Sequence, residues 1–171
     1  IMLTDIAKQQ LRKAGWYEGR KIDLTKYEEE YAKIGCEMFP AARKFLEEFG
    51  DLKICDKFEF PYIKEGVLYN ESSTQWPICT GHRDLELENR VDELYGQKIL
   101  GVGALEYCEI YIYISEDGRF FVNWYFDGLW AENSDQLWNE YYGEEYGRAS
   151  WEDLKAGKGR TMFKKKVKKY L

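Results

Sequence analysis

Apolar residues recur every three or four positions in three short stretches before residue 51, which is typical of helices with one buried face. The sequence predicts helices over residues 5–13, 25–34 and 40–49. Thr25 and Glu28 have the T-x-x-E spacing of a capping box at the start of the second helix. Each helix is followed by a residue that readily ends helices, namely Gly15, Gly35 and Gly50.

The clearest element is a hairpin over residues 107–126, where two runs of alternating side chains flank a turn. Such alternation indicates strands, because successive side chains point to opposite faces of a sheet. A two-residue Asp117-Gly118 turn would mix the faces by placing Ile112 opposite Asn123. A three-residue loop over 116–118 keeps one face wholly apolar, since it sets Ile114 opposite Phe120, Ile112 opposite Val122 and Ile110 opposite Trp124. We expect the second register.

The other face of this hairpin is aromatic and partly polar, with Glu109, Tyr111, Tyr113, Phe121, Asn123 and Tyr125. Either helices cover this face or it contacts a partner. Aromatic side chains in a sheet are usually packed against other elements, which favours the helices.

The remaining elements follow from shorter patterns. The sequence predicts strands over 52–55, 57–60 and 99–105, helices over 84–95 and 134–142, and irregular chain over 64–83 and 143–160. No repeat or linker divides the chain. We expect one α+β domain over residues 1–154, with a central antiparallel sheet flanked by helices, and a separate basic tail over residues 155–171.

The net charge of −6 conceals two parts of opposite sign. Residues 1–154 hold 17 Lys and Arg against 31 Asp and Glu, whereas residues 155–171 hold eight basic residues and no acidic one. An acidic body favours a basic partner and disfavours nucleic acid. The tail could form a basic helix for an anionic surface, fold back as a helix onto the body, or stay solvated. The opposite charges favour folding back.

Histidine and cysteine, which form the usual nucleophile–base pairs and zinc sites, are few in this chain. His82 is the single histidine, and its candidate partner for catalysis is Cys79. A polar loop beside an apolar cysteine explains this pair better than a nucleophile and its base. The cysteines show no ligand spacing and indicate free thiols in a reducing compartment: Cys36, Cys55, Cys79 and Cys108. We expect no enzyme activity, no catalytic residue, no metal site and no cofactor.

Three other features have structural explanations. Acidic residues within 84–95 suit a solvated helix face. Gly101 and Gly103 lack the lysine of a phosphate loop, so close backbone packing explains them better. Trp16 is expected in the core, and Arg20 in an ion pair with an acidic side chain rather than in a binding site.

The segment 126–147 interleaves aromatic and acidic residues. Aromatic anchors ringed by charge are typical of protein interfaces, and an amphipathic helix with buried aromatics explains the pattern equally well. On the first interpretation, the candidate partner-binding residues are Asp127, Trp130, Glu132, Asp135, Trp138, Glu140, Tyr141, Glu144 and Glu145.

Two blocks near the N-terminus, AGWYEGR at 14–20 and FPAARKFLEEFG at 39–50, resemble the SUKH superfamily, specifically its third subfamily. The later stretch 95–121 is also similar, and the resemblance covers residues 3–142. Two departures occur, since Asp51 stands where the family often has a second glycine, and 100–103 lacks a proline. The matching motif residues, expected to be structural, are Gly15, Trp16, Gly19, Arg20, Phe39, Pro40, Phe45, Leu46, Phe49 and Gly50.

The resemblance implies a bacterial immunity protein that neutralises a toxin in the cytoplasm by binding it, often a nuclease or a nucleic-acid deaminase. It supplies no catalytic residues. The acidic body favours a basic toxin domain as this partner, and we expect a monomer, with a dimer as the alternative. The chain shows neither a run of about eighteen apolar residues nor a secretory pattern, so we expect no membrane partner. The alternative is a regulatory or scaffolding module that binds a cellular protein or a membrane surface.

Overall fold

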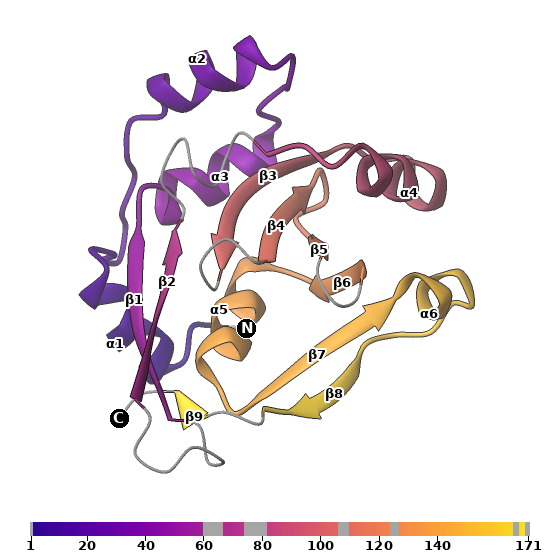
Figure 1. The fold of residues 1–171 in the computed structure, drawn as a ribbon. Coiled ribbons are helices and arrows are strands. Elements are labelled where there is room, and N and C mark those ends of the chain that lie inside the picture. Colours follow the sequence, from indigo (N-terminus) through magenta and orange to yellow (C-terminus); the bar gives the residue numbers. More distant parts are fainter. Residues whose placement is uncertain are drawn as a thin grey trace.

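The structure, a computed structural model, describes residues 2–59, 67–73, 82–105, 110–123, 127–165 and 168–169. Side chains are not described for 55–59, 67–73, 127 and 168–169. Predictions that involve Cys79, Cys108, Glu109, Trp124 or Tyr125 therefore lie outside the described residues. Within the described part the protein has the predicted α+β fold, with six helices around an antiparallel sheet (Figure 1).

The three N-terminal helices are α1 (Asp5–Lys13), α2 (Thr25–Lys33) and α3 (Pro40–Phe49), which confirms the three predicted spans to within one residue. The predicted capping box at the start of α2 is wrong. Leu24 is the N-cap residue, and the Asp23 carboxylate accepts a hydrogen bond from the Thr25 amide at 2.7 Å instead. An acceptor two residues earlier satisfies the same exposed helix-end donor.

The described strands form one sheet in the order β8-β7-β6-β5-β4-β3-β2-β1-β9. Their bounds are β1 (Lys53–Glu59), β2 (Val67–Ser73), β3 (Ile99–Leu105), β4 (Ile110–Ser115), β5 (Phe120–Asn123), β6 (Asp127–Ala131), β7 (Glu145–Ser150), β8 (Thr161–Lys164) and β9 (Lys168–Lys169). The other helices are α4 (Leu85–Tyr95), α5 (Ser134–Tyr142) and α6 (Trp151–Lys155).

The β4–β5 hairpin has the predicted register. Ile114 pairs with Phe120 and Ile112 pairs with Val122, while the third predicted pair involves Trp124, outside the described residues. Gly118 lies at φ 85°, the left-handed conformation that a three-residue loop requires. The hairpin therefore presents a continuous apolar face to the core.

Gly101 is explained by close backbone packing, as predicted. The register shifts between Gly101 and Gly103 where β3 pairs with β4. A Cβ atom at Gly101 would lie 2.7 Å from the backbone oxygen of His82. The Gly101 carbonyl also accepts a hydrogen bond from the buried Tyr31 hydroxyl at 2.6 Å.

Several predicted segments differ from the structure. The two short strands over 52–55 and 57–60 are one strand, β1, and part of the irregular stretch 64–83 is β2. Most of the stretch 143–160 is also regular, as β7 and α6. These strands are short or mostly polar, and pairing with neighbours defines them more than any local pattern does.

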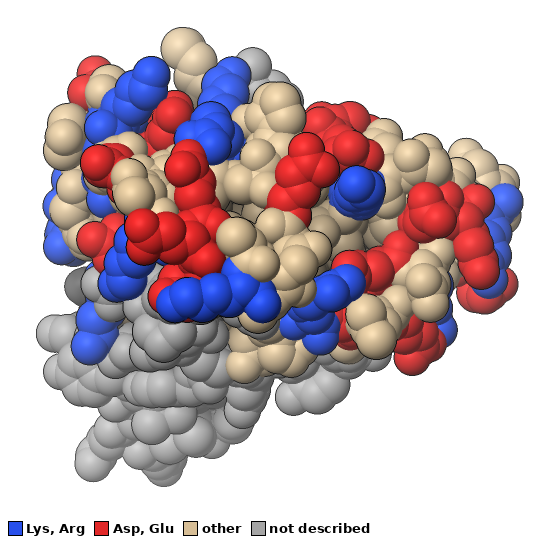
Figure 2. Space-filling model, turned by 90° about the horizontal axis from the view of Figure 1, so that it is seen from above, with Lys and Arg blue, Asp and Glu red and all other residues tan. Residues whose placement is uncertain are grey.

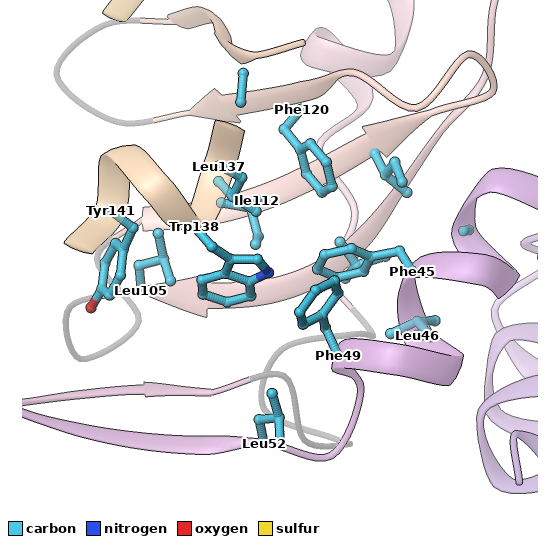
Figure 3. Packing of buried hydrophobic residues seen from close by; sticks show 14 of the residues in the cluster. Phe45, Leu46, Phe49, Leu52, Leu105, Ile112, Phe120, Leu137, Trp138 and Tyr141 are labelled. Atoms are coloured by element: carbon cyan, nitrogen blue, oxygen red, sulfur yellow. The ribbon is translucent and has the colours of Figure 1, made fainter. Parts of the chain in front are cut away.

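The sheet separates two apolar clusters. One lies between the sheet and α1, α2, α3 and α5, and Figure 3 shows its centre, where Phe45 and Phe49 of α3 meet Trp138 of α5. The other lies under α4 and α6 and contains Tyr113 and Phe121 from the second hairpin face. The prediction that helices cover this face is confirmed for these two side chains. Tyr111 is half-buried and Asn123 is exposed.

The C-terminal segment folds back, as the opposite charges predicted, but as strands rather than as a helix. β8 pairs with β7, and β9 pairs with β1, at opposite ends of the strand order. Only residues 165–167 separate the two strands, so the ends of the sheet lie within about 15 Å of each other by chain length alone. β8 and β9 lie close together in Figure 1.

Candidate partner-binding surfaces

The two N-terminal sequence blocks meet at the end of α3. The Arg20 guanidinium donates hydrogen bonds to the carbonyl oxygens of Glu48 at 2.6 Å and Gly50 at 2.7 Å. The Trp16 ring is buried, stacks on Phe49 at 6.4 Å, and donates from Nε1 to the Glu48 carboxylate at 3.2 Å. The ion pair predicted for Arg20 is therefore wrong, because its partners are carbonyl groups at a helix C-terminus.

This corner explains why the blocks occur together. α3 has no basic residue in its last turn, and Arg20 supplies the positive charge that interacts favourably with the exposed carbonyl groups there. The other motif residues in α3 line the core or begin the helix, while Gly15 and Gly19 adopt positive φ. The motif as a whole thus fixes α3 against the N-terminal segment.

We expect Arg20→Ala to lower the free energy of unfolding by about 2–3 kcal/mol, because two hydrogen bonds from a charged donor are lost. Arg20→Lys should recover part of the loss, since an ammonium lacks the guanidinium fork. Urea unfolding measures both. Lys21→Ala, which removes an exposed neighbouring cation, is the matched control and should change stability by less than about 0.5 kcal/mol. Equal effects for both alanine variants would contradict this structural role.

Asp51, the first departure from the family pattern, has a backbone conformation that favours glycine. Asp51 lies at φ 57°, where a second glycine would be unstrained, and aspartate is among the residues that tolerate this region. Its amide donates to the Tyr27 hydroxyl at 2.8 Å. The chain therefore forms a turn with positive φ after α3 without a second glycine.

The aromatic side chains that the sequence offered as docking anchors, Trp130, Trp138 and Tyr141, are buried. Trp138 and Tyr141 are fully buried, with 0% and 1% exposed surface, and Trp130 is 8% exposed in the same cluster. The interpretation of these three side chains as partner-binding anchors is therefore wrong: Trp138 and Tyr141 belong to an amphipathic helix, α5, and Trp130 belongs to strand β6. The physical reason is that α5 packs its aromatic face between α3 and the sheet.

The acidic residues of this segment divide into two groups. Glu140 is largely buried, pairs with Arg160, and accepts a hydrogen bond from the Gly147 amide at 2.6 Å. Its carboxylate is therefore satisfied by partners within the protein. The Asp127 side chain is not described. Glu132, Glu144 and Glu145 are exposed and Asp135 is half-exposed, so a role in binding stays a prediction for these four. Lys164 lies directly across the strand pair from Glu145.

A cleft of about 370 Å³ lies on another face, between the 35–39 loop, α4 and the start of β3. Cys36 and Phe39 line one wall, and Asn89 and Asp92 of α4 line the other. Ile99 and Leu100, both buried, also line it at the start of β3. The sequence analysis missed this cleft, because it is formed by segments that are distant in the chain and carry no shared motif.

Two ion pairs border the cleft. Arg83 donates to both carboxylate oxygens of Glu88, at 2.8 and 3.2 Å. Lys98 lies 3.6 Å from Glu37, and both side chains are at least 70% exposed, so this pair contributes little to stability. Among the described residues Asp92 makes no ion pair. The cleft therefore combines the apolar surface of Cys36 and Phe39 with the carboxylate of Asp92.

His82 has a structural environment. Its Nδ1 lies 2.6 Å from the Tyr113 hydroxyl, and its ring stacks on Tyr111 at 3.9 Å. Burial raises the pKa of Tyr113, which keeps this phenol protonated. Burial also raises the pKa of the Cys36 thiol, the opposite of what an activated nucleophile needs. Within the described residues no group of His, Cys, Asp and Glu side chains is arranged to hold a metal ion.

A family model described as SUKH-3 immunity protein matches residues 3–142. Comparison with curated proteins and with solved structures gave no significant match. In the described part of the chain, no helix has the length and apolar character needed to cross a membrane. The matched region ends with α5, so β7, α6, β8 and β9 lie beyond it.

Proposed function

Because the chain belongs to the SUKH-3 immunity protein family, we propose that it neutralises a cognate toxin by binding the toxin domain directly in the cytoplasm. The family assignment carries the immunity role and implies a toxin as partner. It also favours a binding protein over an enzyme. Within the described residues, the raised pKa of the Cys36 thiol agrees with this, while Cys79, the candidate partner of His82, lies outside them.

The charge of the protein supports a basic toxin domain, such as a nuclease or a deaminase that acts on nucleic acid. Residues 1–154 carry a large excess of acidic residues. Domains that act on nucleic acids commonly present basic surfaces, and opposite fields accelerate the encounter of two proteins. An acidic protein that covers such a surface would block access of the substrate.

The test is co-expression of this protein with the toxin domain encoded beside it, scoring growth and co-purification. We expect growth to be restored and a stable complex to be recovered, with affinity that falls as salt is raised. Rescue without a complex would contradict direct binding and indicate enzymatic or indirect protection. Failure to rescue would favour the regulatory or scaffolding alternative.

A further inference from the structure

The cleft and α4 together form the strongest candidate for the toxin-binding surface. α4 carries Glu86, Glu88, Asp92 and Glu93 against Arg90 alone, so it is the most acidic of the helices described. Figure 2 shows Asp and Glu side chains over the right part of the upper surface, where α4 lies, and also over α2 on the left. The excess of carboxylates adjoins the cleft.

The lining of the cleft defines what can enter it. Cys36 and Phe39 supply apolar surface on one side, while Asp92 and the Asn89 amide lie on the side of α4. An arginine or lysine side chain matches this combination, since it buries a hydrocarbon stem and keeps a charged head for carboxylate and amide oxygens. A purely apolar side chain would leave the Asp92 carboxylate without a compensating charge.

The exposed Glu37–Lys98 pair at the cleft strengthens the match. A pair with this exposure costs little to rearrange, so an incoming cation can replace Lys98 beside Glu37. The bidentate Arg83–Glu88 pair is better fixed and defines the opposite border. The entering group then meets two carboxylates, those of Asp92 and Glu37, beside the apolar surface of Cys36 and Phe39.

We propose that the toxin inserts an arginine or lysine side chain into this cleft, with Asp92 as its principal counter-ion. This inference rests on the proposed function, since it names the surface and the chemistry of the toxin group that binds there. It differs from the surface predicted from sequence, which was centred on residues 126–147.

The deciding experiment measures the dissociation constant of the catalytically inactivated toxin domain for charge-reversal variants. Asp92→Lys should weaken binding by at least about tenfold, because it places like charges together at the contact. Glu152→Lys, with the same charge change at an 86% exposed side chain outside the cleft, should weaken binding by less than about twofold. Asn89→Trp should also weaken binding by filling the cleft without a change of charge.

Loss of folded protein should not account for the weaker binding of Asp92→Lys. Asp92 lies in the last turn of α4, where a lysine interacts favourably with the helix dipole, so Asp92→Lys should unfold no more readily than the wild type. Far-UV circular dichroism and thermal unfolding check this for each variant. Asp92→Asn provides a milder change, with an expected loss of affinity of a few-fold.

A second measurement reports on the cleft itself. Cys36 lines the cleft, so bound toxin should slow alkylation of the Cys36 thiol, followed by mass spectrometry of the peptide that contains it. An unchanged alkylation rate in a complex would overturn the inference. A larger loss of affinity in Glu144→Lys than in Asp92→Lys would also overturn the inference. That outcome would place the interface on the 132–145 surface, and the proposal of immunity by binding would still stand. Absence of wild-type binding would overturn both proposals.

Discussion

Replacement of Trp138 by alanine is expected to lower the free energy of unfolding by about 3–5 kcal/mol, which is a large part of the stability of a domain this size. The Trp138 side chain is fully buried. Its ring lies 5.5 Å from that of Phe49, 6.4 Å from that of Phe45 and 6.1 Å from that of Tyr141. Truncation would leave a cavity between α3, α5 and the sheet that these aromatic rings can fill only in part. Urea unfolding measures the loss.

The same residue separates two explanations of the aromatic segment. If Trp138 were a docking anchor, its replacement would weaken toxin binding with little change in protein stability. If it is a core residue, its replacement lowers protein stability first. Trp138→Phe should therefore keep wild-type affinity at temperatures where it is folded. Tyr17→Ala, at an aromatic side chain that is 57% exposed, is the control and should cost less than about 0.5 kcal/mol. A stable Trp138→Ala variant with weakened binding would restore the anchor interpretation.

Sequence reasoning was most successful where one local pattern determined the structure. The register of the β4–β5 hairpin followed from keeping Ile112 and Ile114 on one apolar face, and α1, α3 and α4 followed from helical spacing with glycine after each. These elements carry the buried side chains of both clusters. The fold class was predictable for that reason.

Elements defined by their neighbours were not predictable in this way. β2 and β7 have polar or glycine-containing sequences, and each is held by pairing with strands on both sides. Likewise the sequence of α5 is compatible with either a surface helix or a core helix, because it does not indicate whether α3 and the sheet cover the aromatic face. The cleft at Cys36 and Asp92 depends on the approach of distant segments, which no spacing in the chain encodes.

Two helices obtain at their C-termini a positive charge that their own sequences lack. Neither α3 nor α5 has a basic residue in its last turn. Arg20 binds the last carbonyl groups of α3, and Lys165 donates to the carbonyl oxygens of Glu140 and Tyr141 in α5, the latter at 2.6 Å. The favourable positive charge at the ends of these two helices thus comes from distant segments. Each contact also links its segment to the packing of α3 or α5.

The pair between Glu140 and Arg160 should contribute as much to the fold as Trp138 does. The two side chains are only 12% and 9% exposed. Removal of one member leaves a buried charge without its partner, so Arg160→Ala and Glu140→Gln should each cost about 3–5 kcal/mol in unfolding free energy. The charge reversal at Glu140 that the sequence suggested as a test of binding would accordingly act on folding.

The double variant Arg160→Met with Glu140→Gln distinguishes a buried pair from a simple loss of packing. It removes both charges, and glutamine retains an oxygen for the Gly147 amide, so its cost should fall below the sum of the single changes by about 1–3 kcal/mol. Truncation after Gly159 removes Arg160, Lys165 and β8 together and should destabilise at least as much as Arg160→Ala. A truncated chain within about 0.5 kcal/mol of the full chain would instead support the predicted division into a domain over 1–154 and an independent tail.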